Sequence, residues 1–507
     1  MPFIVLVVEF LRARPAALAA AAIAAQATLW VLLPTIFYAS PPGELAQLLA
    51  VGHEWQIGSW LGPPLAPWLG EIAFRAAGWF GVYLLAQLCV AGALWIVFLL
   101  GRLLMGATFA AMATLLLTGV LALSIPTPDF GAAVLAMPLT AGTLFAYWRA
   151  LNERRAALWL ALGVLLGLLA LTSYWALLLI ILLAAFTVAT PEGRAALRDF
   201  DPWAAAALAF VIPFPHLGWL YRGGSHLLRA EMPDSSVAAS ALLHWPLMLA
   251  AVAAAHVGFA LLVLTASPLG ADRKALVPTV ERDALSPLAQ RFAIFFAIAP
   301  PVAGTFVAAA LGAPLAQAWS GYLMLCSGLG LMAIVASPLH VFRQQLLAPA
   351  WLAVLLAPPM IIAAAILVLP WISTIELGTQ APATAMARFF TESFQRRVGQ
   401  KLAIVVGDAP EAALIAAASA DRPRFASADH PQQTPWISDA DIARQGAIVV
   451  WRVEGGAAAP PAGVKARFPN LVAEVPQSFP RPIQGLLPTY RLGWGLIRPS
   501  AAAPTAR

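Results

Sequence analysis

The stretch SPPGELAQLLAVGHEWQIGSWLGPPLAPWLGEIAFR occupies residues 40–75 and lies between two long apolar runs of the chain. It is rich in proline, glycine and charge, so it cannot cross a bilayer, where backbone polar groups must be hydrogen bonded within the segment. It gathers three carboxylates, one histidine and three tryptophans: Glu44, Glu54, Glu71, His53, Trp55, Trp60 and Trp68. We therefore interpret residues 40–75 as a loop that membrane-spanning segments hold at a bilayer surface.

The composition is that of a membrane protein with many spans. Of the 507 residues, 61% are hydrophobic and only 11% are charged, whereas a soluble domain carries about 25% charged residues. The formal net charge of +6 does not indicate nucleic-acid binding, because Lys and Arg lie in short loops between apolar runs, as membrane topology requires. Cys89 and Cys326 lie within apolar segments, which predicts buried core residues and neither a disulfide nor a metal pair.

Eleven apolar segments have the roughly 17–25 residues that a transmembrane helix needs. They cover residues 16–38, 78–100, 103–124, 131–148, 157–172, 174–190, 203–221, 239–267, 291–311, 319–337 and 349–371. With a cytoplasmic N-terminus, thirteen basic residues of the loops fall inside and only Arg75, Arg222 and Arg229 fall outside. This bias follows the positive-inside rule. The odd number of spans then predicts that everything after Trp371 lies outside.

The composition changes from about Ser373 onward. The hydrophobic patterns there predict helices over residues 384–400 and 409–420, buried strands over 401–408 and 447–454, and edge strands over 471–477 and 489–497. We therefore expect two domains. Residues 1–372 form an all-α polytopic membrane domain, and residues 373–507 form a small α/β periplasmic domain that ends in a flexible tail.

Ionisable side chains that could carry chemistry gather in the predicted outer loops. The second outer loop contributes Asp129, and the loop after the seventh span contributes Arg222, His226 and Arg229. A carboxylate at a bilayer surface can have its pKa raised by desolvation and then act as a base near neutral pH. Arg side chains can bind a phosphate through forked hydrogen bonds. Together these groups are what a lipid-phosphate substrate requires.

Each of these side chains also has a simpler interpretation. Outer-loop carboxylates can be merely solvated, and tryptophans beside spans commonly anchor the membrane interface. Glu44 follows Pro41-Pro42-Gly43 and could serve only to favour the N-terminus of a short helix. The outer loops contain no HxxxH, CxxC or DxD spacing, so we expect no metal site and no cofactor.

Several short motifs follow one another in a recognisable order. They are Glu44-x-x-Gln47, Gly52–Gly58, Gly62–Leu69, Thr127–Asp129, Gly163–Tyr174, Pro215–Trp219 and Ala318–Gly321. Their order and membrane side resemble those of bacterial GT-C glycosyltransferases of the protein-mannosyltransferase type. That group includes family 39 and the aminoarabinose transferases that act on lipid A. The resemblance covers most of the chain and implies a GT-C membrane domain followed by a soluble domain.

The resemblance also implies an activity. A sugar would be transferred from a polyprenyl-phosphate carrier to a lipid, glycan or protein acceptor on the outer face of the membrane. Glu44 would be the general base of an inverting displacement, and Asp129 would orient the acceptor or stabilise charge on the sugar ring. Substrate would be bound by His53, Glu54, Trp55, Trp60, Pro64, Arg222, His226 and Arg229. Of these, Arg222 or Arg229 would contact the carrier phosphate.

Two alternatives stay open at this point. A transporter or flippase for a lipid or amphiphile would place functional ionisable groups near the bilayer midplane, and His256 lies well inside the eighth predicted span. A catalytically inactive relative of the glycosyltransferases would keep the fold and lose the reaction. The predicted spans contain almost no Asp, Glu, Lys or Arg, which favours an enzyme that works at the membrane surface.

Overall fold

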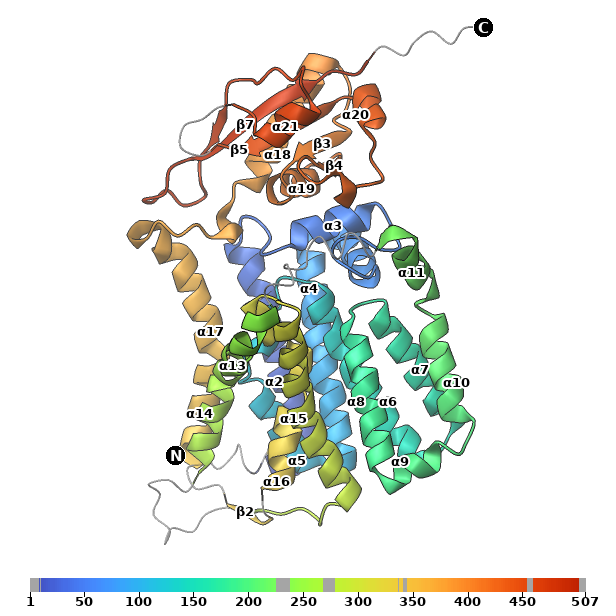
Figure 1. Cartoon of the computed structure of the whole chain (residues 1–507). Coiled ribbons are helices and arrows are strands. Elements are labelled where there is room, and N and C mark those ends of the chain that lie inside the picture. Colours follow the sequence, from blue (N-terminus) through green and yellow to red (C-terminus); the bar gives the residue numbers. More distant parts are fainter. Residues whose placement is uncertain are drawn as a thin grey trace. The chain divides into compact units, whose positions relative to one another are not determined.

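The computed structural model describes residues 9, 11–224, 238–267, 279–335, 337–340, 344–453 and 459–500 (Figure 1). The chain forms two compact units. The helical unit contains Met1–Leu33 and Val82–Ile361, and the mixed unit contains Pro34–Gly81 and Ile362–Arg507. The chain therefore enters the mixed unit twice. We describe each unit by itself.

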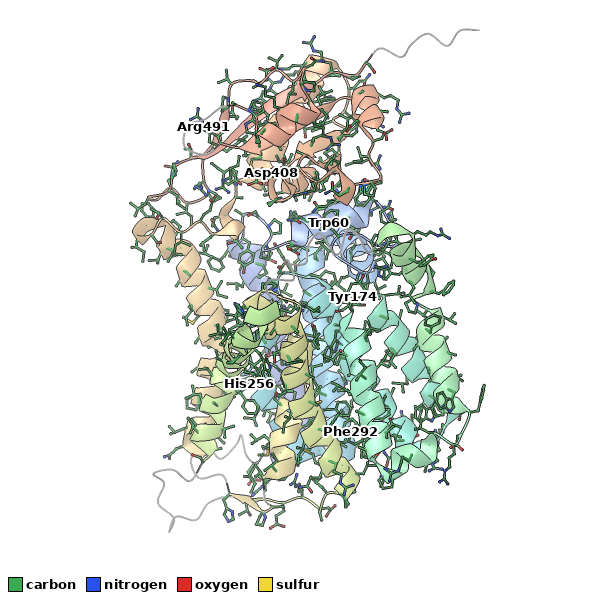
Figure 2. The ribbon with its side chains drawn as sticks, in the orientation of Figure 1. Trp60, Tyr174, His256, Phe292, Asp408 and Arg491 are labelled. Atoms are coloured by element: carbon green, nitrogen blue, oxygen red, sulfur yellow. The ribbon has the colours of Figure 1, made fainter. Side chains whose placement is uncertain are left out.

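Helices make up most of the helical unit, as the apolar sequence predicts. The main ones are α2 (Pro15–Phe37), α4 (Leu65–Met105), α5 (Ala107–Leu117), α6 (Ala132–Glu153), α7 (Ala156–Ala170), α8 (Trp175–Ala189), α9 (Pro191–Ala196), α10 (Asp201–Val211), α11 (Phe214–Trp219), α13 (Ala238–Ala255), α14 (Val257–Ala266), α15 (Pro287–Ala310), α16 (Ser327–Ile334) and α17 (Gln344–Ile372). Their shared core is aromatic: Phe292 of α15 (Figure 2) lies 5.1 Å from Trp148, 5.6 Å from Phe186 and 6.4 Å from Tyr147, measured between ring centroids.

Every predicted span coincides with a helix or a pair of helices, but the helices differ in length. Among the described residues, α2, α4, α15 and α17 are long and apolar enough to cross a membrane. Two further spans are bent pairs: α10 with the segment Phe214–Gly224, at 49°, and α13 with α14, at 52°. The segment predicted over 103–124 is an α-helix only over α5, and that over 319–337 only over α16. The number of eleven crossings stays a prediction.

Helix α4 is broken near its beginning. Ala77 and Gly78 have non-helical backbone angles, and Gly78 has φ +60°, a conformation that glycine adopts at little cost. The break separates residues 65–76 from the part of α4 that coincides with the predicted span 78–100. The two compact units divide the chain close to this break, after Gly81.

A five-stranded sheet forms the centre of the mixed unit. Its strand order is β4-β3-β5-β7-β6, with β3 parallel to β4 and β5, and β7 antiparallel to β5 and β6. The strands are β3 (Ile404–Gly407), β4 (Arg424–Ser427), β5 (Ala447–Arg452), β6 (Gln477–Phe479) and β7 (Tyr490–Ile497). The predicted buried strands 401–408 and 447–454 thus correspond to β3 and β5.

Two of the strand predictions were wrong in detail. Residues 489–497 were expected at an edge, but β7 lies between β5 and β6 and is hydrogen bonded to both strands. Residues 471–477 contribute to the sheet only an isolated bridge from Ala473 to Gly495 and the first residue of β6, Gln477. Val472 and Val475 are exposed, so the apolar residues of this segment did not indicate a buried strand.

The sheet has a separate apolar core on each face. Val405, Ile448 and Val450 point to the face covered by α18 (Ala383–Val398) and α19 (Ala409–Ala418). The alternate residues of the same strands, such as Val406 and Val449, join the core beneath α20 (Asp439–Gln445) and α21 (Ala462–Arg467). Both faces of β3 and β5 are therefore buried, which explains their unbroken apolar sequences.

The stretch 40–75 packs with the sheet and belongs to the mixed unit. Its helix α3 (Leu45–His53) contacts α19 (Figure 1). Ala46, Ala50 and Val51 of α3 share one core cluster with residues of α18, α19 and the sheet. A division of the chain at residue 372 alone, as predicted from composition, therefore omits a part of the C-terminal domain that comes from the beginning of the sequence.

Candidate functional site

Glu44 lies immediately before α3, as expected, but does not serve as its cap. It occupies the N-cap position with φ −95° and ψ 8°, and its side chain makes no capping hydrogen bond. Its carbonyl oxygen accepts the first hydrogen bond of the helix, from the Leu48 N–H at 2.9 Å. The side chain is exposed. The side chain thus does not cap the helix through a hydrogen bond, while its charge still lies at the helix N-terminus, where an acid is favoured.

The chain just before Glu44 is fastened to residues 378–381 of the same unit. The N–H groups of Ala39 and Ser40 donate to the Thr379 carbonyl at 3.0 and 3.1 Å. The Ser40 hydroxyl donates to the Gly378 carbonyl at 2.6 Å and accepts from the Ala381 N–H at 3.1 Å. We call these contacts the Ser40 strap. They fix the backbone that leads into α3.

The other end of α3 is held by an ion pair. Glu54 follows the helix, and both of its carboxylate oxygens accept hydrogen bonds from Arg424 at 2.7 Å. Arg424 also donates to the Trp436 carbonyl at 3.0 Å, and the hydrogen bond to Glu54 raises the pKa of Arg424. A two-point fork of this kind fixes orientation as well as distance. Glu54, predicted to bind substrate, is thus occupied by a partner 370 residues away.

Glu71 is the most deeply buried acid of the stretch, with 1% of its side chain exposed. It accepts hydrogen bonds from Arg422 at 2.6 Å and from Arg75 at 2.8 Å, and its Oε1 lies 3.1 Å from Nδ1 of His53. The Arg422 guanidinium also lies over the Phe74 ring, 4.5 Å from its centroid. His53, another predicted substrate ligand, is therefore part of a charge cluster centred on Glu71.

The three predicted aromatic and proline contacts differ in exposure. Trp60 is only 8% exposed and stacks on Trp436, with ring centroids 6.1 Å apart and planes 19° apart. Pro64 is buried directly before α4. Trp55, in contrast, is 43% exposed and lies 6.5 Å from Trp68. Substrate binding by these residues stays a prediction, and the geometry favours Trp55 over the other two.

Asp129 belongs to the helical unit, in the turn between the 3-10 helix η1 (Leu121–Leu123) and α6. Two buried glutamines hold this turn. Gln26 donates to the Leu123 carbonyl at 2.8 Å, and Gln87 donates to the Thr127 hydroxyl at 2.8 Å. The remaining side-chain oxygens of both glutamines are buried without a hydrogen-bond partner among the described residues. Asp129 itself is half-buried, on a turn whose backbone is well fixed.

Two of the motifs that carry the family resemblance meet within the helical unit. The Tyr174 hydroxyl (Figure 2) lies 3.1 Å from Nε2 of His216, and the His216 ring stacks between those of Tyr174 and Trp219. Arg222 follows in the π-helical segment η2 (Leu220–Gly224) and is exposed. The predicted phosphate ligands His226 and Arg229 lie outside the described residues.

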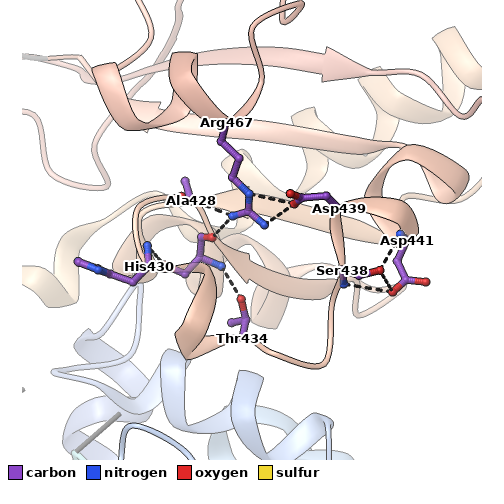
Figure 3. Close-up of polar contacts among 8 residues, drawn as sticks. Ala428, His430, Thr434, Ser438, Asp439, Asp441 and Arg467 are labelled. Carbon is purple, nitrogen blue, oxygen red and sulfur yellow. Dashed lines mark hydrogen bonds and ion pairs between the residues drawn. The ribbon is translucent and has the colours of Figure 1, made fainter. Parts of the chain in front are cut away.

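A further pair of acids lies at the carboxyl ends of the parallel strands. Asp408 follows β3, and its carboxyl is hydrogen bonded to that of Asp429, which follows β4; burial and this neighbour raise the pKa of Asp408 to about 6. Several hydrogen bonds hold the loop that carries Asp429 (Figure 3). Arg467 donates to the Ser427 carbonyl at 2.6 Å, and the Ser427 N–H donates to the Thr434 hydroxyl at 3.1 Å.

Sequence reasoning missed the two arginines that pair with the first loop. Arg422 and Arg424 flank Pro423 at the beginning of β4, and on the sequence alone they are two surface-type charges of a soluble domain. Their spacing around a proline was the one available signal. In the part of the chain that the structure describes, no three His, Cys, Asp or Glu side chains are grouped as metal ligands would be. The expected absence of a metal stays a prediction.

This architecture is similar to that of known membrane glycosyltransferases. The family model described as dolichyl-phosphate-mannose-protein mannosyltransferase matches residues 62–219. The crystal structure of ArnT from Cupriavidus metallidurans bound to undecaprenyl phosphate aligns with a TM-score of 0.56 at 12% identity, covering 96% of this chain and 98% of that one. The apo form of the same ArnT gives 0.44 at 13% identity, covering 94% and 97%. No curated protein matches this chain in sequence.

An oligosaccharyltransferase from Archaeoglobus fulgidus, in its apo form, aligns with a TM-score of 0.40 at 13% identity, covering 81% of this chain and 64% of that one. The resemblance to GT-C glycosyltransferases that the motifs indicate is thus confirmed, and the fold is that of ArnT. The fold and the apolar helices together support a multi-pass membrane protein.

Proposed function

We propose that this chain is a membrane glycosyltransferase that moves a sugar from a polyprenyl-phosphate carrier to a lipid, glycan or protein hydroxyl on the periplasmic face of the inner membrane. The observation that carries the proposal is the ArnT fold, which extends over 96% of the chain and whose ArnT example was solved with undecaprenyl phosphate bound. The family-model match over residues 62–219 points to the same donor class. As the outer-loop motifs predict, the proposal includes neither a metal nor a cofactor.

Glu44 is the general base in this proposal. The acceptor hydroxyl oxygen attacks the anomeric carbon while its proton passes to the Glu44 carboxylate. The bond from that carbon to the carrier phosphate breaks, and its electron pair leaves on the phosphate oxygen, so the configuration at the sugar carbon is inverted. Support comes from the exposure of the Glu44 side chain at the beginning of α3, four residues after the backbone that the Ser40 strap fixes.

Asp129 and Arg222 take supporting roles. Asp129 orients the acceptor or stabilises positive charge on the ring, and the glutamine-held turn supports a fixed carboxylate there. Arg222, exposed at the end of a bent helix pair, binds the carrier phosphate. Changing it to Ala removes a charge-assisted contact of about 1.5–3 kcal/mol, so the donor KM is expected to rise by about tenfold or more.

The test uses full-length protein in membranes with radiolabelled polyprenyl-phosphate sugars. Glu44→Gln keeps the shape of the side chain but cannot accept the proton, so turnover should fall by roughly 10²–10⁴-fold, while Glu44→Asp retains part of it. Glu192→Gln is the matched control, because Glu192 is also an exposed acid at a helix beginning, that of α9. Full activity of Glu44→Gln would remove Glu44 from the reaction. Inactivity of the unmodified protein with every donor would favour an inactive relative.

The transporter alternative depends on His256 as a functional ionisable residue, and the contacts of His256 do not favour such a role. His256 lies at the bend between α13 and α14 (Figure 2). Its Nδ1 lies 2.8 Å from the Val252 carbonyl and must donate, and its Nε2 then accepts from the Ser327 hydroxyl at 2.9 Å. Both ring nitrogens are thus used to stabilise the bend, which favours a structural role.

A further inference from the structure

The first loop is fastened to the rest of the mixed unit at two separate places. The Ser40 strap holds the chain before Glu44. Beyond α3, Arg424 holds Glu54 and Arg422 holds Glu71. We call Arg422 and Arg424 the arginine clamp. Glu44 lies between the strap and the clamp, so its position depends on both.

The clamp is built with backbone strain. Arg422 has φ +49°, although it is not glycine and although a residue before proline is normally confined to the extended region. A left-handed conformation of this kind costs about 1–3 kcal/mol and persists only where the surroundings determine it. Here the Arg422 side chain is 19% exposed and engaged by Glu71 and Phe74. The contact is thus retained at a cost in local conformational energy.

Helix α3 would pack against the mixed unit without the arginine clamp. Ala46, Ala50 and Val51 already bury the helix in the same apolar cluster as Ile415 and Phe425. Apolar contacts of this kind are not directional, whereas forked Arg–carboxylate bonds fix an orientation. Buried ion pairs in general add little net stability compared with apolar residues of similar size. The ion pairs of Arg422 and Arg424 therefore serve to fix the orientation of α3.

We propose that Arg422 and Arg424 are positioning residues for sugar transfer, which set the angle of α3 and so the place of the Glu44 carboxylate; this rests on the proposed function of Glu44. Helix α3 has nine residues and is about 13 Å long at 1.5 Å per residue. The strap ends at Ser40, four residues before Glu44, so a tilt of about 5° at the clamp still displaces the Glu44 end of α3 by roughly 1 Å. A misplacement of about 1 Å can lower a rate 10²-fold.

The decisive variant is the neutral pair Glu54→Gln with Arg424→Gln. It removes the ionic fork without leaving a single buried charge, which would destabilise the fold. In full-length purified protein, kcat should fall by about tenfold to 10²-fold while the donor KM stays within twofold. The charge-reversed pair Glu54→Arg with Arg424→Glu should recover part of kcat, and Arg424→Lys should lie between. Arg388→Gln is the control, because Arg388 is an exposed arginine that also pairs with a glutamate.

A second readout does not depend on transfer. Hydrogen exchange of the α3 amides should be faster in the neutral pair than in the unmodified protein, while β3 and β5 stay protected. Unchanged kcat in the neutral pair, or a fall equal to that of Arg388→Gln, would overturn the proposal. Unchanged α3 exchange would overturn it as well. If the unmodified protein shows no transfer with any donor, the proposed function fails, and the exchange measurement still decides whether the clamp holds α3.

Discussion

Trp60 offers a sharp choice between a substrate contact and a packing residue. Replacing it by Ala removes a ring that is 8% exposed and that packs against Trp436 and Phe425, at centroid distances of 6.1 and 6.3 Å. Such buried Trp→Ala changes cost about 3–5 kcal/mol. Aromatic pairing contributes about 0.5–1.5 kcal/mol of that loss. The structure therefore predicts a large loss of stability from a residue that the sequence placed among the substrate ligands.

The loss can be measured as a change in melting temperature of the full-length protein in detergent. For a unit of 150–250 residues, 1 kcal/mol shifts the midpoint by about 2–4 °C, so Trp60→Ala should lower the melting of the mixed unit by roughly 6–20 °C. Trp55→Ala is the matched control, because Trp55 lies in the same loop and is 43% exposed. It should change the midpoint by no more than about 2 °C.

Transfer kinetics distinguish the two interpretations of Trp60. If the ring is a packing residue, the donor KM of the protein that stays folded should be unchanged in Trp60→Phe, which keeps an aromatic ring in the core. A Trp60→Ala variant that melts within about 2 °C of the unmodified protein and shows a raised donor KM would refute the reasoning from burial.

Three further results are expected. Arg422→Ala should cost about 1.5–3 kcal/mol of stability, because it removes a charged hydrogen bond from the buried Glu71 carboxylate, whereas Arg75→Ala, 54% exposed in an i,i+4 pair, should cost about 0.3–0.5 kcal/mol; equal costs would contradict this. Asp408→Asn should raise the melting midpoint near pH 7.5 and have little effect below about pH 4. The pKa of Asp408 is raised to about 6 in the folded protein, so its carboxyl destabilises the fold increasingly as the pH rises from about 4 to above 6. An effect that does not depend on pH would be contrary evidence. Cysteines at the exposed positions Ile57 and Ala440 should both react with a membrane-impermeant maleimide in spheroplasts, and labelling of one alone would break the predicted topology.

The elements of the fold could be predicted because their signals are local. Residues 404–407 and 447–452 form unbroken apolar runs, which predict strands buried on both faces. Each predicted span contains a helix or a bent pair of helices. The breaks within spans were not predicted. The bend at His256 depends on hydrogen bonds to Val252 and Ser327, and the Ser327 contact is invisible to a window of neighbouring residues.

The candidate site was predictable only in part. Glu44 was placed correctly before a short helix, since Pro41-Pro42-Gly43 and the apolar residues after it are local signals. The partners of Glu54 and Glu71 were not, because Arg424 and Arg422 lie 370 and 351 residues further along the chain. Local sequence patterns do not predict which residues so far apart will form ion pairs. An acid in a loop therefore looked available when it was already engaged.

The same separation has a consequence for biosynthesis. When residues 40–75 emerge from the ribosome, the arginines that will receive Glu54 and Glu71 have not yet been made. At about 5–20 residues per second, the 351 residues between Glu71 and Arg422 take roughly 20–70 s to synthesise. During that interval Glu54, Glu71 and Trp60 lack the partners that cover them in the finished protein. Premature termination anywhere before residue 422 would leave them in that state permanently.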